Sequence, residues 1–133
     1  MDLKEYFSTH RGVGILSTAD SNGKVDAAIY ARPHVNYDGT LAMIMRDHLT
    51  HKKLQENPHA AYLIIENSRC YQGVRLFIKK LREDDDPELI RKMTRRSLTP
   101  EEDKAKGPKS LVYFLVEKVL ELIGDETPEQ LVD

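Results

Sequence analysis

Short runs rich in hydrophobic and β-branched residues, separated by polar turn residues, fill the first third of the chain. Val13 to Ala19 and Val25 to Ala31 flank Asp20 to Gly23, whose residues tolerate the left-handed geometry of tight turns. A second pair of runs, Val35 to Tyr37 and Thr40 to Met45, is joined by Asp-Gly, a strong hairpin signal. These patterns predict two antiparallel hairpins, and hence a sheet or barrel built from meanders.

Three other segments carry helical signals. The N-terminal residues predict a short amphipathic helix that ends near Gly12. Thr50 to Glu56 has a helical composition, and we expect Thr50 to cap this helix and Asn57-Pro58 to end it. A further helix is expected from Pro87 to Arg96, because three aspartates precede it at the positive end of its dipole.

The remaining hydrophobic runs predict strands of different kinds. Ala60 to Ile65 is largely apolar, as expected for a central strand, and Val74 to Leu81 alternates imperfectly with apolar side chains on one face. Thr99 to Ser110 is charged and contains two prolines, which predicts a loop with one helical turn. Leu111 to Ile123 fits a helical face and a strand equally well, so its pattern alone leaves both structures open.

The size, composition and charge of the chain limit the classes of protein to which it can belong. The chain has 133 residues and a mass of 15.3 kDa, the size of one domain, and 40% of its residues are hydrophobic. With 20 basic and 22 acidic side chains the formal net charge is −2, which argues against a nucleic-acid partner. A small anionic ligand remains possible, because it needs only a local cluster of positive groups.

Cysteine content and hydropathy indicate the compartment. Cys70 is the only cysteine, so an intrachain disulfide or a cysteine-based zinc site is excluded, which suits a reducing environment. The N-terminal segment lacks the apolar stretch of a signal peptide, and the longest apolar run, Leu111 to Val116, is far too short to span a membrane. We therefore expect a soluble cytoplasmic protein without a membrane partner.

The segment between Ala31 and Tyr62 has the outline of a phosphate site. A basic residue, Arg46, ends the second hairpin, and Thr50 and Lys52 lie at the start of the following helix. The first turn of a helix has unpaired N–H groups and a partial positive charge. Arg46 and Lys52 would add charge-assisted hydrogen bonds to phosphate oxygens, and Thr50 a hydroxyl donor.

The same residues also have a purely structural interpretation. Thr50 can serve only as a helix cap, and Lys52 and Lys53 can simply form the solvated face of the helix. The chemistry of the residues alone leaves the ligand site and the structural role both open.

The order of these segments along the chain resembles that of a known protein family. The run from Val13 to Val35, the Asp-Gly hairpin and the Thr-His-Lys-Lys-Leu-Gln-Glu-Asn-Pro helix together resemble the pyridoxamine 5′-phosphate oxidase-like flavoproteins, over roughly Phe7 to Leu81. Those proteins are FMN-binding split β-barrels. The resemblance implies a mainly β, antiparallel, Greek-key-like fold with a few helices, forming a single domain over residues 1–133. Leu111 to Ile123 would then include a barrel strand.

The resemblance also implies FMN as the cofactor and a set of residues that contact it. Thr50, His51 and Lys52 would hold the phosphate, while main chain and side chains near Arg32 and Arg46 would line the flavin ring. Gln72 or Gly73 would match a further contact at the start of a later strand. The full implied set is Arg32, Pro33, His34, Val35, Ile44, Met45, Arg46, Thr50, His51, Lys52 and Gln72.

The sequence departs from the vitamin B6 oxidase itself. That enzyme binds substrate through a C-terminal Trp- and Arg-rich signature, and this chain has no tryptophan. The resemblance therefore implies a small flavoprotein, an FMN-dependent oxidoreductase or reductase that acts on a small redox substrate or NAD(P)H. It also implies a homodimer with FMN between the subunits. The catalytic residues stay unassigned, because the flavin carries the redox chemistry.

The five histidines raise two further interpretations, a zinc site and a haem site. His48 and His51 lie three residues apart, but no cysteine or carboxylate at a recognisable spacing completes a zinc site, so no metal is expected. His34 could serve as an axial haem ligand, because split-barrel relatives that handle haem exist. A non-enzymatic flavin, haem or tetrapyrrole carrier on the same fold is therefore the alternative function.

Overall fold

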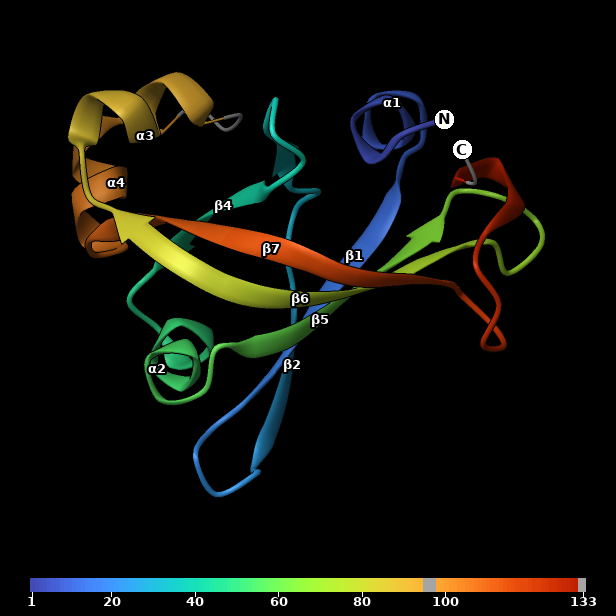
Figure 1. Cartoon of the computed structure of the whole chain (residues 1–133). Coiled ribbons are helices and arrows are strands. Elements are labelled where there is room, and N and C mark those ends of the chain that lie inside the picture. Colours follow the sequence, from blue (N-terminus) through green and yellow to red (C-terminus); the bar gives the residue numbers. More distant parts are fainter. Residues whose placement is uncertain (95–97, 132–133) are drawn as a thin grey trace.

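The computed structural model describes residues 1–94 and 98–131 and arranges them around one antiparallel sheet (Figure 1). These residues form seven strands, in the order β2-β1-β5-β6-β7-β4-β3, together with four α-helices. In chain order the elements are α1 (Leu3–Thr9), β1 (Gly12–Ala19), β2 (Val25–Ile29), β3 (His34–Val35), β4 (Leu41–Arg46), α2 (Leu49–Glu56), β5 (His59–Glu66), β6 (Gly73–Asp84), α3 (Pro87–Met93), α4 (Pro100–Ala105), β7 (Lys109–Glu121) and the 3-10 turn η1 (Glu129–Leu131).

Both predicted hairpins are confirmed, but they lie at opposite edges of the sheet. β1 pairs with β2 and β3 pairs with β4, each in antiparallel register. β2 and β3 are consecutive in the chain yet form the two ends of the strand order, with no ladder between them in the described residues. The sheet therefore curves toward closure and leaves a gap at this seam, as a split barrel does.

The ambiguous segment near the C-terminus is a strand. β7 pairs with β4 on one side and with β6 on the other, so its backbone hydrogen bonds are made within the sheet. Its register with β6 shifts at two places, beside Phe77 and beyond Lys80, and such bulges bend long strands. The prediction of a central strand is also confirmed, because β5 lies between β1 and β6.

The helices begin and end close to their predicted limits, with one correction. The prediction that Thr50 caps α2 is wrong, because His48 is the N-cap residue and Thr50 lies inside the first turn. Asp86 caps α3 through its side chain, as the aspartate run predicts, and Pro87 follows it. The predicted end of this helix at Arg96 lies outside the described residues. α4 supplies the helical turn expected after Thr99.

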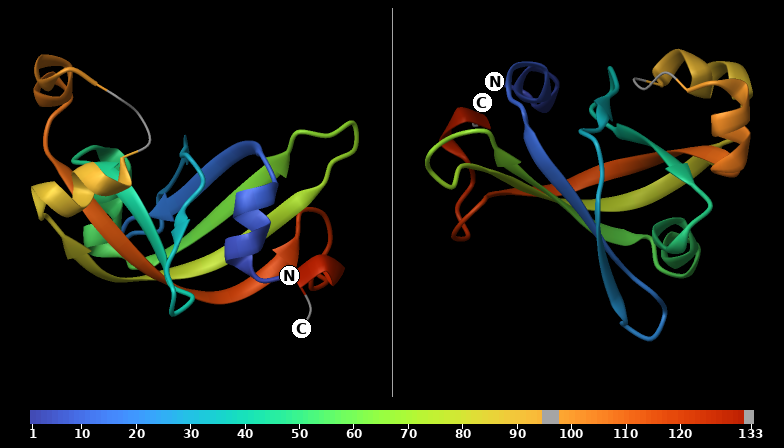
Figure 2. Two further views of the ribbon diagram at one scale, coloured as in Figure 1. Left: turned by 90° about the horizontal axis from the view of Figure 1, so that it is seen from above. Right: turned by 180° about the vertical axis from the view of Figure 1, so that it is seen from behind.

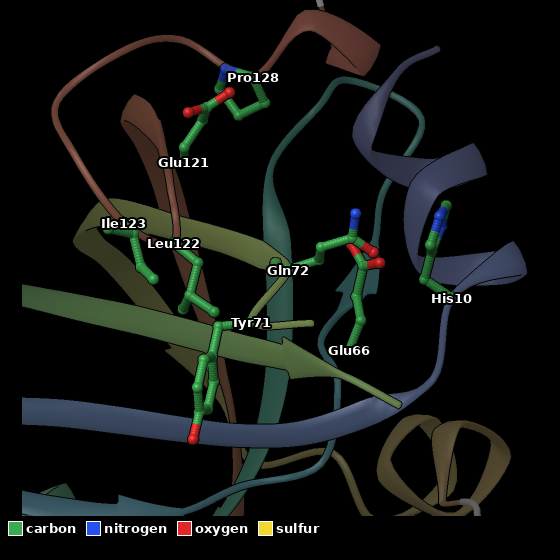
Figure 3. Close-up of a pocket in the computed structure, with 9 residues that line it drawn as sticks. His10, Glu66, Tyr71, Gln72, Glu121, Leu122, Ile123 and Pro128 are labelled. Carbon is green, nitrogen blue, oxygen red and sulfur yellow. The ribbon is translucent and has the colours of Figure 1, made fainter. Parts of the chain in front are cut away.

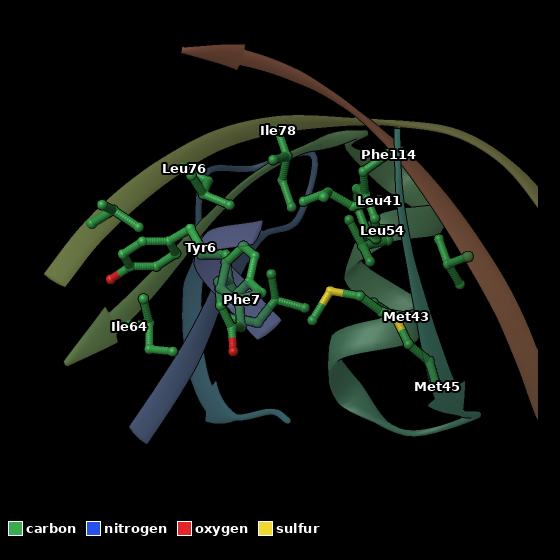
Figure 4. Close-up of a cluster of buried hydrophobic side chains, with 14 residues drawn as sticks. Tyr6, Phe7, Leu41, Met43, Met45, Leu54, Ile64, Leu76, Ile78 and Phe114 are labelled. Carbon is green, nitrogen blue, oxygen red and sulfur yellow. The ribbon is translucent and has the colours of Figure 1, made fainter. Parts of the chain in front are cut away.

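A single large hydrophobic cluster fills the inner side of the curved sheet (Figure 4). Tyr62, Leu76 and Phe114 are fully buried there, and α1 and α2 add Phe7 and Leu54. A smaller cluster lies elsewhere, where α3 packs on β4 and β7, and Figure 2 shows α3 and α4 together at one end of the β6–β7 pair. None of the helices in the described residues is long and apolar enough to cross a membrane.

Gly14 allows two inner groups to approach β1 closely. A Cβ atom at this position would lie 1.9 Å from the Tyr62 hydroxyl and 2.6 Å from the Tyr30 carbonyl oxygen. That hydroxyl donates a hydrogen bond to the same carbonyl, over 3.2 Å. Glycine at this position therefore lets the chain after β2 pack against β1.

The outer face of β1, β2 and β5 is also apolar, but no helix described here covers it. The strand register places Ile15, Ile29 and Leu63 in one row across three strands. Ile29 is 78% exposed and Val25 is 81% exposed. Neither hydrophobic cluster of the described residues includes these side chains. Large apolar side chains gathered on one sheet face are typical of a protein–protein interface.

Candidate functional site

The first turn of α2 brings together the three residues predicted to bind phosphate. Thr50, His51 and Lys52 are consecutive in this turn, and the N-cap residue His48 makes no side-chain hydrogen bond to it. The leading N–H groups of the helix therefore keep their capacity to donate. Lys52 is exposed and forms no ion pair with any residue in the described parts of the chain.

Thr50 points into the protein rather than outward. It is 4% exposed, and its hydroxyl donates a hydrogen bond to Asp26 Oδ2 on β2, over 3.2 Å. Lys53 is also buried, with 8% exposure, and its ammonium group donates to the Lys24 carbonyl over 3.1 Å. The interpretation of Lys53 as a solvated residue is therefore wrong. Both side chains attach α2 to the β1–β2 hairpin.

His51 lies between two carboxylates. Its Nε2 atom is 2.6 Å from Glu83 Oε1 and its Nδ1 atom is 3.2 Å from Asp47 Oδ1. Burial opposes the charged imidazole, but these hydrogen bonds outweigh it and raise the pKa of His51. Because both ring nitrogens face carboxylate oxygens, the geometry favours the imidazolium, which donates through both.

Glu83 joins β6 to α2 through several donors. Besides His51, it accepts hydrogen bonds from Lys80 and, over 2.6 Å, from Gln55. Burial acts against ionisation of this carboxyl, but the donors overcome it and lower its pKa to about 2. Glu83 is therefore an anion whose charge is compensated by its neighbours.

Arg46 holds α4 and the loop that follows it. Its guanidinium donates to Asp103 Oδ1 over 2.8 Å, and to the carbonyl oxygens of Asp103 and Gly107 over 3.1 and 2.7 Å. Lys109 also contacts Asp103 Oδ1, at 2.8 Å. Hydrogen bonds from Lys109 and Arg46 lower the pKa of Asp103. The donors that the sequence offers to a ligand are used here within the chain.

The residues predicted to line the flavin ring surround β4. His34 and Val35 pair with β4, and the preceding Pro33 is buried. Met45 is 1% exposed and belongs to the large core cluster, so only its main chain could contact a ligand. Ile44 points to the other face of β4, where it packs in the small cluster with α3. Arg32 connects β2 to this region and is partly buried.

Gln72 lies far from α2 within one chain. Gln72 immediately precedes β6. Lys80 lies further along the same strand, and its N–H donates to the carbonyl oxygen of Pro58, two residues after α2. Seven or eight strand residues separate the two places, about 25 Å. The structure thus brings together Thr50, His51 and Lys52, and places β3 and β4 beside one another, but it does not bring Gln72 to them. Contact with a shared ligand would need a second copy of the chain.

Gln72 instead lines a cavity of about 450 Å³ at the β5–β6 turn (Figure 3). Glu66 and Glu121 contribute carboxylates to this cavity, and no lysine or arginine of the described chain lines it. The buried Tyr6 hydroxyl donates to Glu66 Oε2 over 2.5 Å, and burial followed by this contact raises the pKa of Tyr6. The acidic lining makes this cavity a poor site for a phosphate.

Sequence reasoning missed the acidic partners Asp26, Glu83 and Asp103. Glu83 contacts His51, which lies 32 positions earlier in the chain, and Asp103 contacts Arg46, which lies 57 positions earlier. The three aspartates that follow Glu83 predicted only a helix start, and no spacing rule connects residues so far apart. The described residues contain no group of three or more His, Cys, Asp or Glu side chains that could hold a metal ion.

Comparisons with known proteins support the fold. No protein-family model matches the sequence, and neither does any curated protein. Among solved structures, an FMN-binding protein from Syntrophomonas wolfei subsp. wolfei is similar, with a TM-score of 0.72 and 18% identity over 90% of this chain and 83% of the other. An F420 reductase gives 0.68 and 12% identity, over 90% and 97% of the chains. HupZ from Group A Streptococcus gives 0.67 and 13%, over 95% of each.

These similarities extend over almost the whole chain at low identity. The sheet of seven antiparallel strands with four helices in the described residues matches the split β-barrel structures. The chain therefore has the split β-barrel fold of these solved structures, as the resemblance implied. At such identity the similarity establishes the fold and leaves ligand and activity to be argued from the site.

Proposed function

We propose that this split-barrel protein binds FMN and acts as a flavin-dependent oxidoreductase on a small redox substrate or NAD(P)H. In this proposal the phosphate of FMN lies at the first turn of α2. Similar structures include an FMN-binding protein and an F420 reductase, which supports a flavin-type cofactor and redox chemistry. The fold alone does not carry the proposal, because one fold can serve many functions.

The observation that carries the proposal is the uncapped first turn of α2 with Lys52 beside it. The N-cap residue makes no side-chain hydrogen bond to the turn, and Lys52 is exposed without an ion-pair partner among the described residues. Backbone N–H groups and the helix dipole favour an anion there, and a lysine adds a charge-assisted hydrogen bond. The positive groups present therefore fit a phosphomonoester.

The chain's own residues would hold and orient the cofactor. Lys52 and the α2 amides would bind the phosphate, while Arg32, His34 and the main chain of β3 and β4 would position the ring. Bound FMN would supply hydride and electron transfer, which no side chain can perform. Thr50 would act indirectly, since its hydroxyl is bonded to Asp26 and fixes the helix start.

A homodimer is part of the proposal. The outer face of β1, β2 and β5 exposes Ile29 and Val25, and a second copy would bury this surface. Dimerisation would also allow Gln72 of one subunit to reach the cofactor of the other, which a single chain does not allow. Cys70 lies exposed in the β5–β6 loop, so a reducing compartment such as the cytoplasm suits the protein.

The absorption spectrum of the purified protein, before and after addition of FMN, tests the proposal. Flavin bands that stay with the protein through gel filtration are expected. Anaerobic addition of NADPH or NADH then separates an enzyme from a carrier, because only direct reduction bleaches the bound flavin. A protein that ignores FMN but gives a Soret band with haemin would contradict the proposal and support a tetrapyrrole carrier.

A further inference from the structure

The end of β6 and the segment that connects β6 to β7 each contribute one acid that contacts a basic residue of the proposed cofactor site. Glu83, near the end of β6, binds His51 on α2. Asp103, near its end on α4, binds Arg46 on β4. Both basic partners belong to the set that the sequence assigns to the cofactor. Asp103 comes from the connecting segment and Glu83 from β6, so the chain's own carboxylates compensate both basic residues.

The contact at Asp103 has the geometry of an anion site. A single carboxylate oxygen, Oδ1, lies 2.8 Å from Arg46 Nη2 and 2.8 Å from Lys109 Nζ. Shared contact with one guanidinium and one ammonium group is also how proteins bind a phosphate oxygen. The Asp103 carboxylate therefore stands where an anionic ligand oxygen could stand.

This cluster adjoins the start of α2. The N–H of Asp47 donates to the Pro108 carbonyl over 3.3 Å, and the N–H of His48 donates to the Arg46 carbonyl over 2.8 Å. Asp47 and His48 are the only residues between Arg46 and the first residue of α2. The Arg46–Asp103–Lys109 cluster is therefore joined to the uncapped helix turn by a short, hydrogen-bonded stretch of backbone.

The attachment of α4 at this place is of a kind that a ligand can replace. The Arg46 side chain is 17% exposed and that of Asp103 is 38% exposed, so solvent screens their ion pair. α4 itself has no buried residue, and the neighbouring α3 buries only Ile90. No buried apolar residue of its own holds α4, and the contacts of Asp103 with Arg46 and Lys109 link it to the sheet.

We propose that Arg46 and Lys109 form an anion-binding pair that Asp103 occupies in the free chain, and that the phosphate of the incoming ligand competes with Asp103 for it. The inference rests on the proposed function, because it takes FMN as the phosphate-bearing ligand. It assigns Lys109 to the site and gives Asp103 a role as an internal competitor. Binding of the phosphate would release α4 from Arg46.

The test compares Asp103→Asn with Glu101→Gln. Both remove one negative charge from α4, but Glu101 forms no ion pair with a described residue, so it controls for the change in net charge. Affinities for FMN and for riboflavin, which lacks the phosphate, are measured by flavin fluorescence. Asp103→Asn is expected to bind FMN roughly threefold to tenfold more tightly than the control, with riboflavin unchanged. Circular dichroism verifies that both variants fold.

The outcomes distinguish this inference from the proposed function. If the wild type binds FMN and Asp103→Asn binds it no more tightly than Glu101→Gln, the competitor role is overturned while the function stands. If no variant prefers FMN to riboflavin, the proposed function fails. Titration with inorganic phosphate then decides the inference alone: shifts of the Arg46 and Lys109 NMR resonances must be larger in Asp103→Asn than in the wild type, and equal shifts overturn it.

Discussion

In the part of the chain that the structure describes, the outer face of the sheet is covered by a helix at β4 but not at β1, β2 and β5. On β4, alternate side chains enter the large core, while Ala42 and Ile44 on the other side are covered by α3. On β1 and β5 the inner face also enters the large core, but Ile15, Ile29 and Leu63 on the outer face of β1, β2 and β5 have no cover from the described chain. The chain thus covers one half of its sheet itself and leaves an apolar surface on the other.

This difference connects the fold with the proposed function. Arg46 of the proposed cofactor site lies on the covered half, and Asp103 on α4 binds it. The uncovered half offers the surface through which a second subunit would complete that site. If both proposals hold, one half of the sheet would respond to the ligand and the other would serve assembly.

The largest effect is expected from a charge on the uncovered face. Ile29→Glu places a carboxylate in the centre of the proposed interface, where burial without a partner is costly. Light scattering after gel filtration should show a fall from twice the chain mass of 15.3 kDa to that mass. Tyr37→Glu, at a fully exposed turn, should leave the dimer intact. A wild-type protein that is monomeric at all concentrations would contradict the comparison.

Two core substitutions compare how much the large cluster and the small cluster under α3 contribute to the free energy of unfolding. Leu76→Ala removes a fully buried side chain from the large cluster and should lower the free energy of unfolding by about 3–4 kcal/mol. Ile90→Ala, in the small cluster under α3, should cost about 2 kcal/mol because its surroundings can relax. Urea denaturation measures both. Equal losses of unfolding free energy in the two variants would show that α3 is held as firmly as the large cluster, and would contradict the difference between the two regions.

The His51–Glu83 pair should give the stability a defined pH dependence. Because the pKa of His51 is raised, its contribution is full below its ordinary pKa of 6.5 and is lost as pH rises through the folded value. Because the pKa of Glu83 is lowered from 4.5 to about 2, its contribution is present above pH 4.5 and is lost as pH falls toward 2. The pair therefore stabilises most between these two ordinary values.

Glu83→Gln tests this pair with a smaller effect. At pH 5.5 we expect a loss of about 1–2 kcal/mol in the free energy of unfolding, and a smaller loss once the pH exceeds the raised pKa of His51, where the imidazole is neutral in both proteins. Glu117→Gln breaks a more exposed His–Glu contact, at 3.6 Å from His59, and should cost less than about 0.5 kcal/mol. A loss for Glu83→Gln that does not vary with pH would rule out the charged imidazole.

Local patterns in the sequence predicted most of the elements, because hairpin turns, helix stops and alternation act over a few residues. The Asp86–Pro87 helix start and the alternation along β6 are examples. The identity of β7 needed long-range information, since pairing with β4 and β6 selects the strand. For the same reason the position of β2 and β3 at opposite edges could not be read from their sequences.

The candidate site was predictable only in part. The sequence pattern indicated the Thr50–Lys52 turn because these residues are adjacent. It could not show that Thr50 faces Asp26, or that Arg46 is bound by Asp103, because these contacts depend on how distant segments pack. A list of basic residues gives their charge but not the acids that neutralise them, so which residues remain available to a ligand becomes visible only in the fold.

The most direct test of the central claim is the affinity for FMN relative to riboflavin, measured by fluorescence for the wild type and for Lys52→Ala. Lys53→Ala is not a suitable control because Lys53 is buried, so Lys24→Ala, an exposed lysine on the β1–β2 turn, serves instead. We predict that the wild type prefers FMN, and that Lys52→Ala weakens FMN binding by about 10–100-fold while riboflavin is unaffected. Unchanged FMN affinity in Lys52→Ala would contradict the assignment of the phosphate to α2.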